Sequence, residues 1–280
     1  MDKKQICNEI QGFVRKEAGN SLPDGRPIFD EPLVGFAAAD DPLFDVYKTV
    51  IGNFHRKPRE ILADARTVIV WVLPISAVVR ETNRREKELP SLSWAWTRGQ
   101  GEEFNESLRR HVVSILQEHG FTAEAPQLQE SWQVVEDPAT GIASTWSERH
   151  AAYAAGLGTF GLSDSLITSR GSAHRVGSVI TSLFISPSPR PYGAPREYCL
   201  HFRGVKCGGC IRRCPVGAIT AEGHDKIKCR EHVYGPLTKA LAEVCGFAKA
   251  GCGLCQTGVP CEAEVPESPP KLFQPHMTTP

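Results

Sequence analysis

The sequence predicts an α+β fold that is followed by a smaller cysteine-rich lobe. Through residues 1–185, stretches with a helical spacing of apolar residues alternate with short stretches rich in β-branched residues. Nine of the ten cysteines lie between Cys199 and Cys261, and the proline-rich stretch Ser186 to Pro195 separates the two parts. Mixed helices and strands are typical of a layered sandwich. We therefore expect a domain at 1–190, a lobe at 191–265 and a flexible tail at 266–280.

The first elements are predicted by their apolar patterns. Met1 to Gly19 has the spacing of an amphipathic helix. Arg66 to Ile75 is rich in β-branched residues and follows a helical stretch near Pro58 to Asp64. It predicts a buried central strand.

A long helix is expected in the middle of the chain. Glu102 to His119 places apolar residues at helical spacing and stops at Gly120, a common C-terminal signal. Trp94 and Trp96 precede it in a stretch rich in serine and glycine. We expect a loop there, in which the two rings either line a pocket or cap the core.

Further along, short strands alternate with one alanine-rich helix. Strands are expected at Ser131 to Glu136, Ser165 to Thr168 and Val176 to Ile185. Thr145 to Glu148 matches a capping box that opens the helix, which stops near Gly156. The pattern assigns Glu148 to helix capping.

Charge and hydropathy exclude several classes of partner. Lys+Arg and Asp+Glu are both 32, so no net field favours a nucleic acid or an anionic membrane. The longest apolar run, Val68 to Pro74, is far shorter than the roughly 20 residues of a membrane span. The first residues lack a signal-peptide pattern. We expect a cytoplasmic protein with a small-molecule or protein partner.

The cysteine spacing predicts two [4Fe–4S] clusters. In two-cluster ferredoxins, three cysteines of one run hold one cluster, and the fourth, before a proline, reaches the other. Cys207-x2-Cys210-x3-Cys214-Pro215 reproduces the end of that run. If each cluster takes ligands from both halves of the cysteine-rich lobe, the first set is Cys199, Cys207, Cys210 and Cys261. The second set is Cys214, Cys252, Cys255 and either Cys229 or Cys245. Structural zinc held by four cysteines is the alternative.

One segment resembles a known superfamily. Ser147 to Ser182 begins SERHAAYAAGLGTFG, which is similar to the E-R-x-A-x-x-A-G-L-G-x-x-G segment of epoxyqueuosine reductases and reductive dehalogenases. The resemblance extends to VGFAAADDPLF at Val34 to Phe44, to the VIVWVLP strand and to the cysteines. It implies a nitroreductase-like α/β sandwich that holds a cobalamin, with the clusters reducing its cobalt. It also favours Cys229 over Cys245 as a ligand.

The same resemblance suggests residues that contact the cofactor. The alanine-rich helix lets a flat group approach, and the glycines after it form a turn whose backbone can touch a ligand; close packing of the helix is the alternative. Arg149 could bind a phosphate or carboxylate. The expected contacts are Arg149, Gly156, Leu157, Gly158, Phe160, Gly161 and Ser178.

The catalytic acid is not identified by this comparison. Epoxyqueuosine reductases have an acidic proton donor before the Glu-Arg pair, where this chain has Ile142. Asp137 lies a few residues upstream. Reductive dehalogenases use a tyrosine, for which Tyr153 is a candidate, and His150 titrates near neutrality. These three residues are the candidates for the proton donor.

The sequence thus predicts an iron–sulfur oxidoreductase that passes electrons through two clusters to a cobalamin, which reduces a small organic substrate. A low-potential donor such as ferredoxin or flavodoxin is the expected partner, and a nucleic acid is expected only if the substrate is a tRNA. The alternative is a non-catalytic electron-transfer or corrinoid-reducing protein that serves a partner enzyme.

Overall fold

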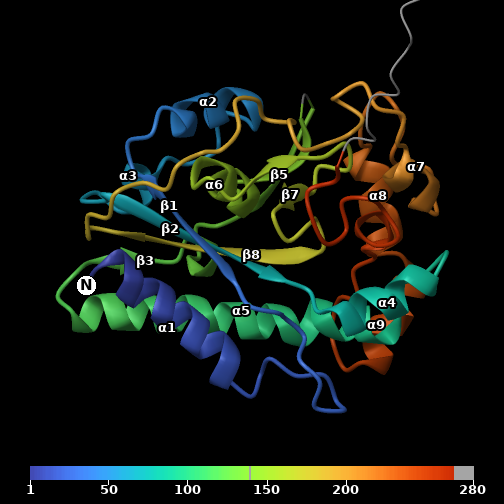
Figure 1. Cartoon of the computed structure of the whole chain (residues 1–280), viewed down its shortest axis with the longest axis horizontal. Helices are drawn as coiled ribbons and strands as arrows, with labels where there is room; N and C mark the ends of the chain where they lie inside the picture. The colour runs from blue at the N-terminus through green and yellow to red at the C-terminus, as the bar shows by residue number, and fades with distance from the viewer. Residues whose placement is uncertain (139, 268–280) are drawn as a thin grey trace, which may run out of the picture.

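A four-stranded antiparallel sheet forms the centre of the molecule. The computed structural model describes residues 1–138 and 140–267, so most of the expected tail lies outside the described residues. The strand order is β1 (Leu33–Ala38), β2 (Thr67–Pro74), β8 (His174–Thr181) and β3 (Ala123–Glu124). Every residue of β2 is buried, as expected for the central strand. The α+β prediction is confirmed (Figure 1).

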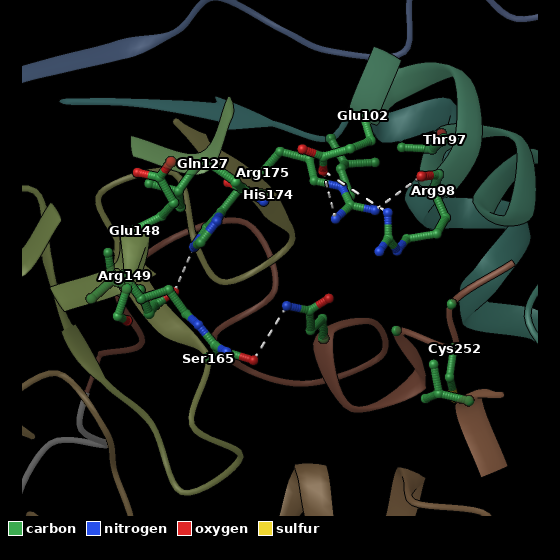
Figure 2. A pocket seen from close by; sticks show the side chains of 18 of the residues that line it. Thr97, Arg98, Glu102, Gln127, Glu148, Arg149, Ser165, His174, Arg175 and Cys252 are labelled. Carbon is green, nitrogen blue, oxygen red and sulfur yellow. Dashed lines mark hydrogen bonds and ion pairs between the residues drawn. The ribbon is translucent and has the colours of Figure 1, made fainter. Parts of the chain in front are cut away.

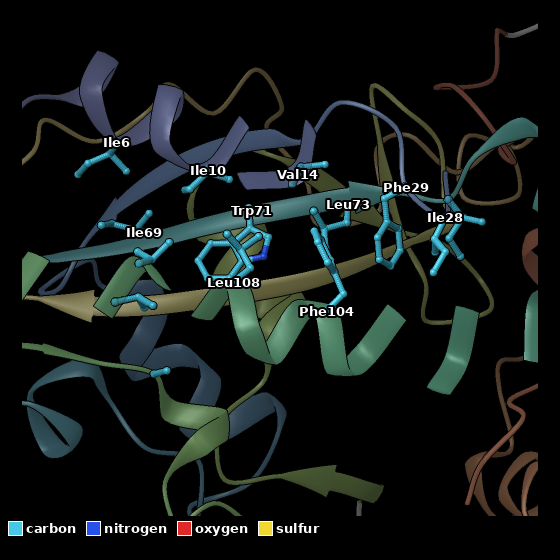
Figure 3. Close-up of a cluster of buried hydrophobic side chains, with 14 of the residues drawn as sticks. Ile6, Ile10, Val14, Ile28, Phe29, Ile69, Trp71, Leu73, Phe104 and Leu108 are labelled. Carbon is cyan, nitrogen blue, oxygen red and sulfur yellow. The ribbon is translucent and has the colours of Figure 1, made fainter. Parts of the chain in front are cut away.

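Two helices cover one face of this sheet. They are α1 (Lys3–Lys16) and α5 (Leu92–Glu118), which run below the sheet in Figure 1. Ile6 and Ile10 of α1 pack with Phe104 and Leu108 of α5 around Trp71 of β2 (Figure 3). Each such burial stabilises the fold by roughly 1.5–3 kcal/mol. The helix expected at Met1 to Gly19 is confirmed.

The other face carries shorter elements. Three helices lie there, α2 (Leu43–Val50), α3 (Pro58–Ile61) and α6 (Glu148–Ala154), with the hairpins β4 (Val134–Asp137)/β5 (Gly141–Ser144) and β6 (Gly158–Phe160)/β7 (Leu166–Thr168). Alanines of α6 are fully or almost fully buried against β2 and β8, which brings the helix close to the sheet. Phe44 of α2 stacks on Trp146 at 5.8 Å.

The cysteine lobe packs on one end of the sandwich. It contains α7 (Gly209–Arg213), α8 (Lys226–Val233), α9 (Pro236–Val244) and the 3₁₀ turn η2 (Leu254–Gln256), and it contacts α4 (Ala77–Arg85) and α5. A second 3₁₀ turn, η1 (Pro126–Leu128), lies beside β8. Arg213 donates to the carbonyl of Asn83, and Arg84 donates to Glu262 at 2.7 Å. These polar contacts fix the lobe to α4.

The expected start of the long helix was wrong. Helix α5 begins at Leu92, because the Ser91 side chain accepts a hydrogen bond from Trp94 N and caps it. Gly99 and Gly101 had suggested a loop. A Cβ at Gly99 would come within 2.1 Å of the Phe247 ring. The glycines within the helix therefore allow other side chains to pack closely against it. Trp94 and Trp96 are therefore helical residues.

None of the helices in the described residues combines the length and the apolar character that crossing a bilayer requires.

Candidate functional site

A cavity of about 470 Å³ lies between the sandwich and the cysteine lobe. Residues of α5, α6, β8 and the loop around Cys252 form its wall (Figure 2). Three indole rings contribute apolar surface, those of Trp94, Trp132 and Trp146. Besides the Cys252 thiol, the charged and titratable side chains of the wall are Arg98, Glu102, Glu148, Arg149, His174 and Arg175.

Glu102 is the centre of a buried arginine cluster. Its carboxylate lies 3.1 Å from Arg109 Nη1, 3.3 Å from Arg175 Nη1 and 3.9 Å from Arg98 Nη1. Burial acts to raise the pKa of Glu102, but the three guanidinium groups outweigh it, and the pKa is lowered. Glu102 is therefore ionised. Burial and the neighbouring Arg98 lower the pKa of Arg175 to about 10.

Glu148 has a different environment. Among the described residues its ion pair is with Arg109, at 3.5 Å, and neither carboxyl oxygen makes a hydrogen bond of normal length and angle. Burial raises the pKa of Glu148, against the opposing effects of Arg109 and of the nearby Ser178 and Trp146 side chains. The capping role expected for Glu148 was wrong: α6 has Ser147 at its N-cap, no side chain caps it, and the Glu148 side chain lies in the cavity wall.

His174 supplies a neutral imidazole to the wall. Burial lowers the pKa of His174 to about 4. Its Nε2 lies 2.8 Å from the carbonyl oxygen of Leu166, which can only accept, so Nε2 carries the proton. Nδ1 is then an acceptor, and it has no partner. The wall thus contains three buried polar atoms without partners, two on Glu148 and one on His174.

The residues expected to contact a cofactor are mostly elsewhere. Of the seven, all within the described residues, only Arg149 lines this cavity, and it donates to the carbonyl of Asp164. A Cβ at Gly156, which has a φ of 80°, would lie 2.3 Å from the carbonyl oxygen of Pro189, and one at Gly158 equally close to that of Ile167. These two glycines permit backbone packing.

The other expected contacts also lie inside the protein. Leu157 packs into the core beside Gly35, and Phe160 lies against the His150 ring at 4.6 Å. Gly161 approaches Ile167. Ser178 is fully buried and accepts a hydrogen bond from Trp146 Nε1. Ser178 thereby orients an indole of the cavity wall.

None of the three weak acid candidates lines the cavity. His150 bonds Ser147 Oγ at 2.8 Å, and burial lowers its pKa to about 3. Tyr153 stacks on Tyr192 at 5.1 Å. Asp137 accepts a hydrogen bond from Thr140 N in the β4/β5 turn. Their catalytic roles stay predictions.

Four of the cysteines enclose a second, smaller cavity of about 30 Å³. They are Cys199, Cys207, Cys210 and Cys261, the set obtained by crossing the two halves of the motif. Burial raises the pKa of the Cys210 thiol to about 12, and the nearby thiols of Cys261, Cys199 and Cys207 act in the same direction. Ser172 Oγ donates to Cys261 Sγ at 3.7 Å.

Of the six remaining cysteines, four form a second group, and Cys7 and Cys245 lie apart from it. Burial raises the pKa of the Cys255 thiol well above its ordinary value, and it is raised further by Cys252, Cys229, Cys210 and Cys214. Cys229 interacts with His224, whereas Cys245 packs among Ala95, Ala242 and Ala250. Cys252 also lines the large cavity.

The described residues contain no set of three or more His, Cys, Asp or Glu side chains arranged to hold one metal ion. A single ion requires its ligands to converge on one point. The four thiolates of a [4Fe–4S] cluster instead bind four different iron atoms.

Sequence reasoning missed most of the cavity wall. Arg98, Glu102 and Arg109 lie four and seven residues apart on α5, so a helical periodicity of charge could have revealed them. His174 and Arg175 begin β8, where two polar residues precede an apolar strand. No local sequence pattern marked Trp132 and Trp146 as residues of the cavity wall.

Comparison with known proteins gives matches only among solved structures. No protein-family model matches the chain, and no curated protein matches it. A structure of Bacillus subtilis epoxyqueuosine reductase with its catalytic loop swung out of the active site has a TM-score of 0.50 at 17% identity, covering 92% of this chain and 66% of that one.

Two reductive dehalogenases are also similar. A catabolic enzyme in complex with 3-bromo-4-hydroxybenzoic acid has a TM-score of 0.53 at 15% identity, covering 93% of this chain and 37% of that one. A structure described for B12-dependent dehalogenation has a TM-score of 0.52 at 15% identity, covering 84% and 30%. The chain spans slightly less than two thirds of the reductase and about a third of each dehalogenase. It has an epoxyqueuosine reductase/reductive dehalogenase-like fold.

Proposed function

We propose that this protein is an iron–sulfur oxidoreductase in which two [4Fe–4S] clusters pass electrons to a cobalamin in the large cavity, for the reduction of a small organic substrate. One observation carries the proposal. Cys252 is close to Cys214 and Cys255 and also lines the cavity that contains the unpartnered groups of Glu148 and His174. A cluster held there would lie next to any bound redox group.

The thiol groups fit two clusters. The ligands of the first would be Cys199, Cys207, Cys210 and Cys261, and those of the second Cys214, Cys229, Cys252 and Cys255. The donor chemistry is appropriate, because thiolates favour iron–sulfur clusters and zinc. The backbone N–H of Ala218 donates to Cys214 Sγ at 3.1 Å, a contact of the kind that tunes cluster potential.

The positions of the cysteines support an order for the two proposed clusters. The second group is adjacent to the cavity through Cys252, and the indole of Trp94, which also lines the cavity, packs against Gly253. The first group lines the smaller cavity, and one of its members, Cys210, lies near Cys255. Electrons from a low-potential donor such as ferredoxin or flavodoxin would enter at the first cluster and leave from the second.

The cavity wall fits a corrinoid in its chemistry. Cobalamin has a rim of carboxamide groups, which both donate and accept hydrogen bonds. Nδ1 of His174 is buried without a partner among the described residues, so it can accept such a contact, and the Glu148 carboxyl group offers a further buried polar group. Trp94, Trp132 and Trp146 offer apolar surface to a flat ring. Bound cobalamin would supply a strongly reducing cobalt centre, and Arg149 could bind an anionic group of the cofactor or substrate.

The same proposal includes a division of the chain into two domains. We regard residues 1–190 as a nitroreductase-like corrinoid-binding domain and 191–265 as a ferredoxin-like lobe. The reducing cytoplasm, which keeps thiols available for iron, is the compartment that suits this chemistry. One similar structure contains a tRNA stem loop, so the substrate is either a small molecule or a modified tRNA.

A second function is favoured by one observation. Ile142, on β5, occupies the position at which epoxyqueuosine reductases have their acid, and it pairs with Glu136 in the hairpin. If no other acid serves, the protein would transfer electrons to a partner or to its corrinoid without reducing a substrate.

Anaerobic purification with added cobalamin tests the proposal. Iron, sulfide and cobalt would be measured on one sample together with its absorption spectrum. Two clusters and one corrinoid correspond to about eight iron and one cobalt per chain. Eight iron without cobalt would support the electron-transfer function instead, and zinc in place of iron would refute both.

A further inference from the structure

We propose that Glu148 is the proton donor of the reduction, in place of the acid that Ile142 replaces. This inference rests on the proposed function. Glu148 is the carboxyl group of the cavity wall that lacks hydrogen bonds, whereas Asp137, His150 and Tyr153 do not line the cavity.

The two carboxyl groups of the wall have opposite environments. Three guanidinium groups surround Glu102, and its pKa is lowered. Glu148 is buried at the start of α6, and burial raises its pKa. Two carboxyl groups whose surroundings separate their pKa values are a common arrangement of an acid beside a permanent charge. Burial thus favours the neutral form of Glu148, whereas the three guanidinium groups favour the carboxylate of Glu102.

Arg109 lies beside Glu148 but makes shorter contacts with other groups. It therefore permits a neutral carboxyl group at Glu148 before proton transfer, and it stabilises the Glu148 carboxylate after transfer. Its guanidinium already donates to Gln127 Oε1 at 2.7 Å, to Glu102 Oε1 at 3.1 Å and to the carbonyl of Val176 at 3.2 Å. The 3.5 Å pair with Glu148 is the longest of these contacts, and it is no hydrogen bond. A carboxylate formed at Glu148 would still face this positive charge.

The remaining titratable groups nearby are consistent with this role. On β8, His174 is neutral and Arg175 is engaged with Glu102. On α6, Arg149 donates to Asp164 O. The negative charge of Glu102 on α5 further raises the pKa of Glu148. The side chains of Ser178 and Trp146 act with Arg109 to lower the pKa of Glu148, but burial outweighs them and the pKa is raised.

The step balances as follows. Two electrons reach the substrate one at a time from the low-potential donor through the clusters. The O–H bond of Glu148 breaks and a bond from that proton to the reduced substrate atom forms, while the leaving group departs with its electron pair. Glu148 becomes a carboxylate beside Arg109 and regains a proton from water.

The first test is infrared spectroscopy of the anaerobically loaded protein. A neutral carboxyl has a carbonyl stretching band that a carboxylate lacks. At neutral pH we expect this band in the wild type and in the control Glu103→Gln, which changes an exposed glutamate on the same helix as Glu102. We expect the band to disappear in Glu148→Gln. A wild type without the band, or a Glu148→Gln variant that keeps it, would overturn the inference.

Turnover and loading complete the test. With 3-bromo-4-hydroxybenzoic acid as the probe and a chemical reductant, Glu148→Gln should slow reduction by about 10²–10⁴-fold, the usual contribution of a general acid. Glu148→Asp should recover part of the rate, and Glu103→Gln should match the wild type. An unchanged rate in Glu148→Gln would refute the role. Because iron and cobalt content are measured on the same samples, a failure of the proposed function appears as missing metal, separately from the carboxyl band.

Discussion

The indole ring of Trp94 lies directly against the backbone of Gly253. A Cβ at Gly253 would come within 1.9 Å of the ring, and the residue has a φ of +64°, which favours glycine. Trp94 belongs to the sandwich and lines the large cavity, whereas Gly253 follows the proposed ligand Cys252. This contact joins the second cysteine group to the cavity wall.

The variant Gly253→Ala tests that contact. The new methyl group would force the ring or the loop to move, which costs about 1–3 kcal/mol in a packed site. We expect a lower free energy of unfolding and fewer iron atoms per chain. Gly246→Ala is the matched control, because Gly246 has a φ of +76° but no atom within 4 Å of a Cβ. Equal losses in the two variants would attribute the effect to backbone strain alone.

Substitution of single cysteines tests the ligand sets. Cys229→Ser should lose most of the second cluster, about half of the iron, because Cys229 lies near Cys255. Cys245→Ser should keep the full iron content, because Cys245 packs among alanines. Iron and sulfide analysis with electron paramagnetic resonance of the reduced protein would detect the difference. The reverse result would make Cys245 the ligand.

Glu262 should fasten the lobe to α4. This buried carboxylate accepts from Arg84 at 2.7 Å and from Gly258 N at 2.6 Å, and lies 3.4 Å from Arg80. Glu262→Ala would leave Arg80 without its partner, and because Arg84 is half exposed we expect a loss of about 2–3 kcal/mol in the free energy of unfolding. Denaturant titration would measure it. The exposed Glu264→Ala is the control, and a loss of similar size there would contradict the assignment.

Acid should destabilise the protein partly through His174. Burial lowers its pKa to about 4, below the 6.5 of an unfolded histidine, so the unfolded state binds more protons between these values. The stabilisation is complete above about pH 6.5 and is lost as the pH falls towards 4, by at most about 3 kcal/mol. His174→Gln should flatten this dependence of the free energy of unfolding, and the exposed His119→Gln should not. Parallel pH profiles for the wild type and His174→Gln would exclude His174 as the source.

Local patterns in the sequence determined several elements. The apolar spacing of α1, the β-branched run of β2 and the stop at Gly120 are all set by neighbouring residues, and each was confirmed. The α+β class follows from the same patterns. Where a local pattern had two meanings, the prediction failed: Gly99 and Gly101 suggested a loop, and Glu148 suggested a cap.

Only the tertiary structure decided which side chains share the cavity. Arg98 and Glu102 come from α5, Glu148 from α6 and His174 from β8, and they meet because β8 lies next to β2 between the two helices. Burial then separates the pKa values of Glu102 and Glu148, which no local pattern encodes. Cysteine spacing is a property of the sequence itself, so it could predict clusters. The environment of a buried charge arises only when distant segments exclude water from it, so it could not be read in advance.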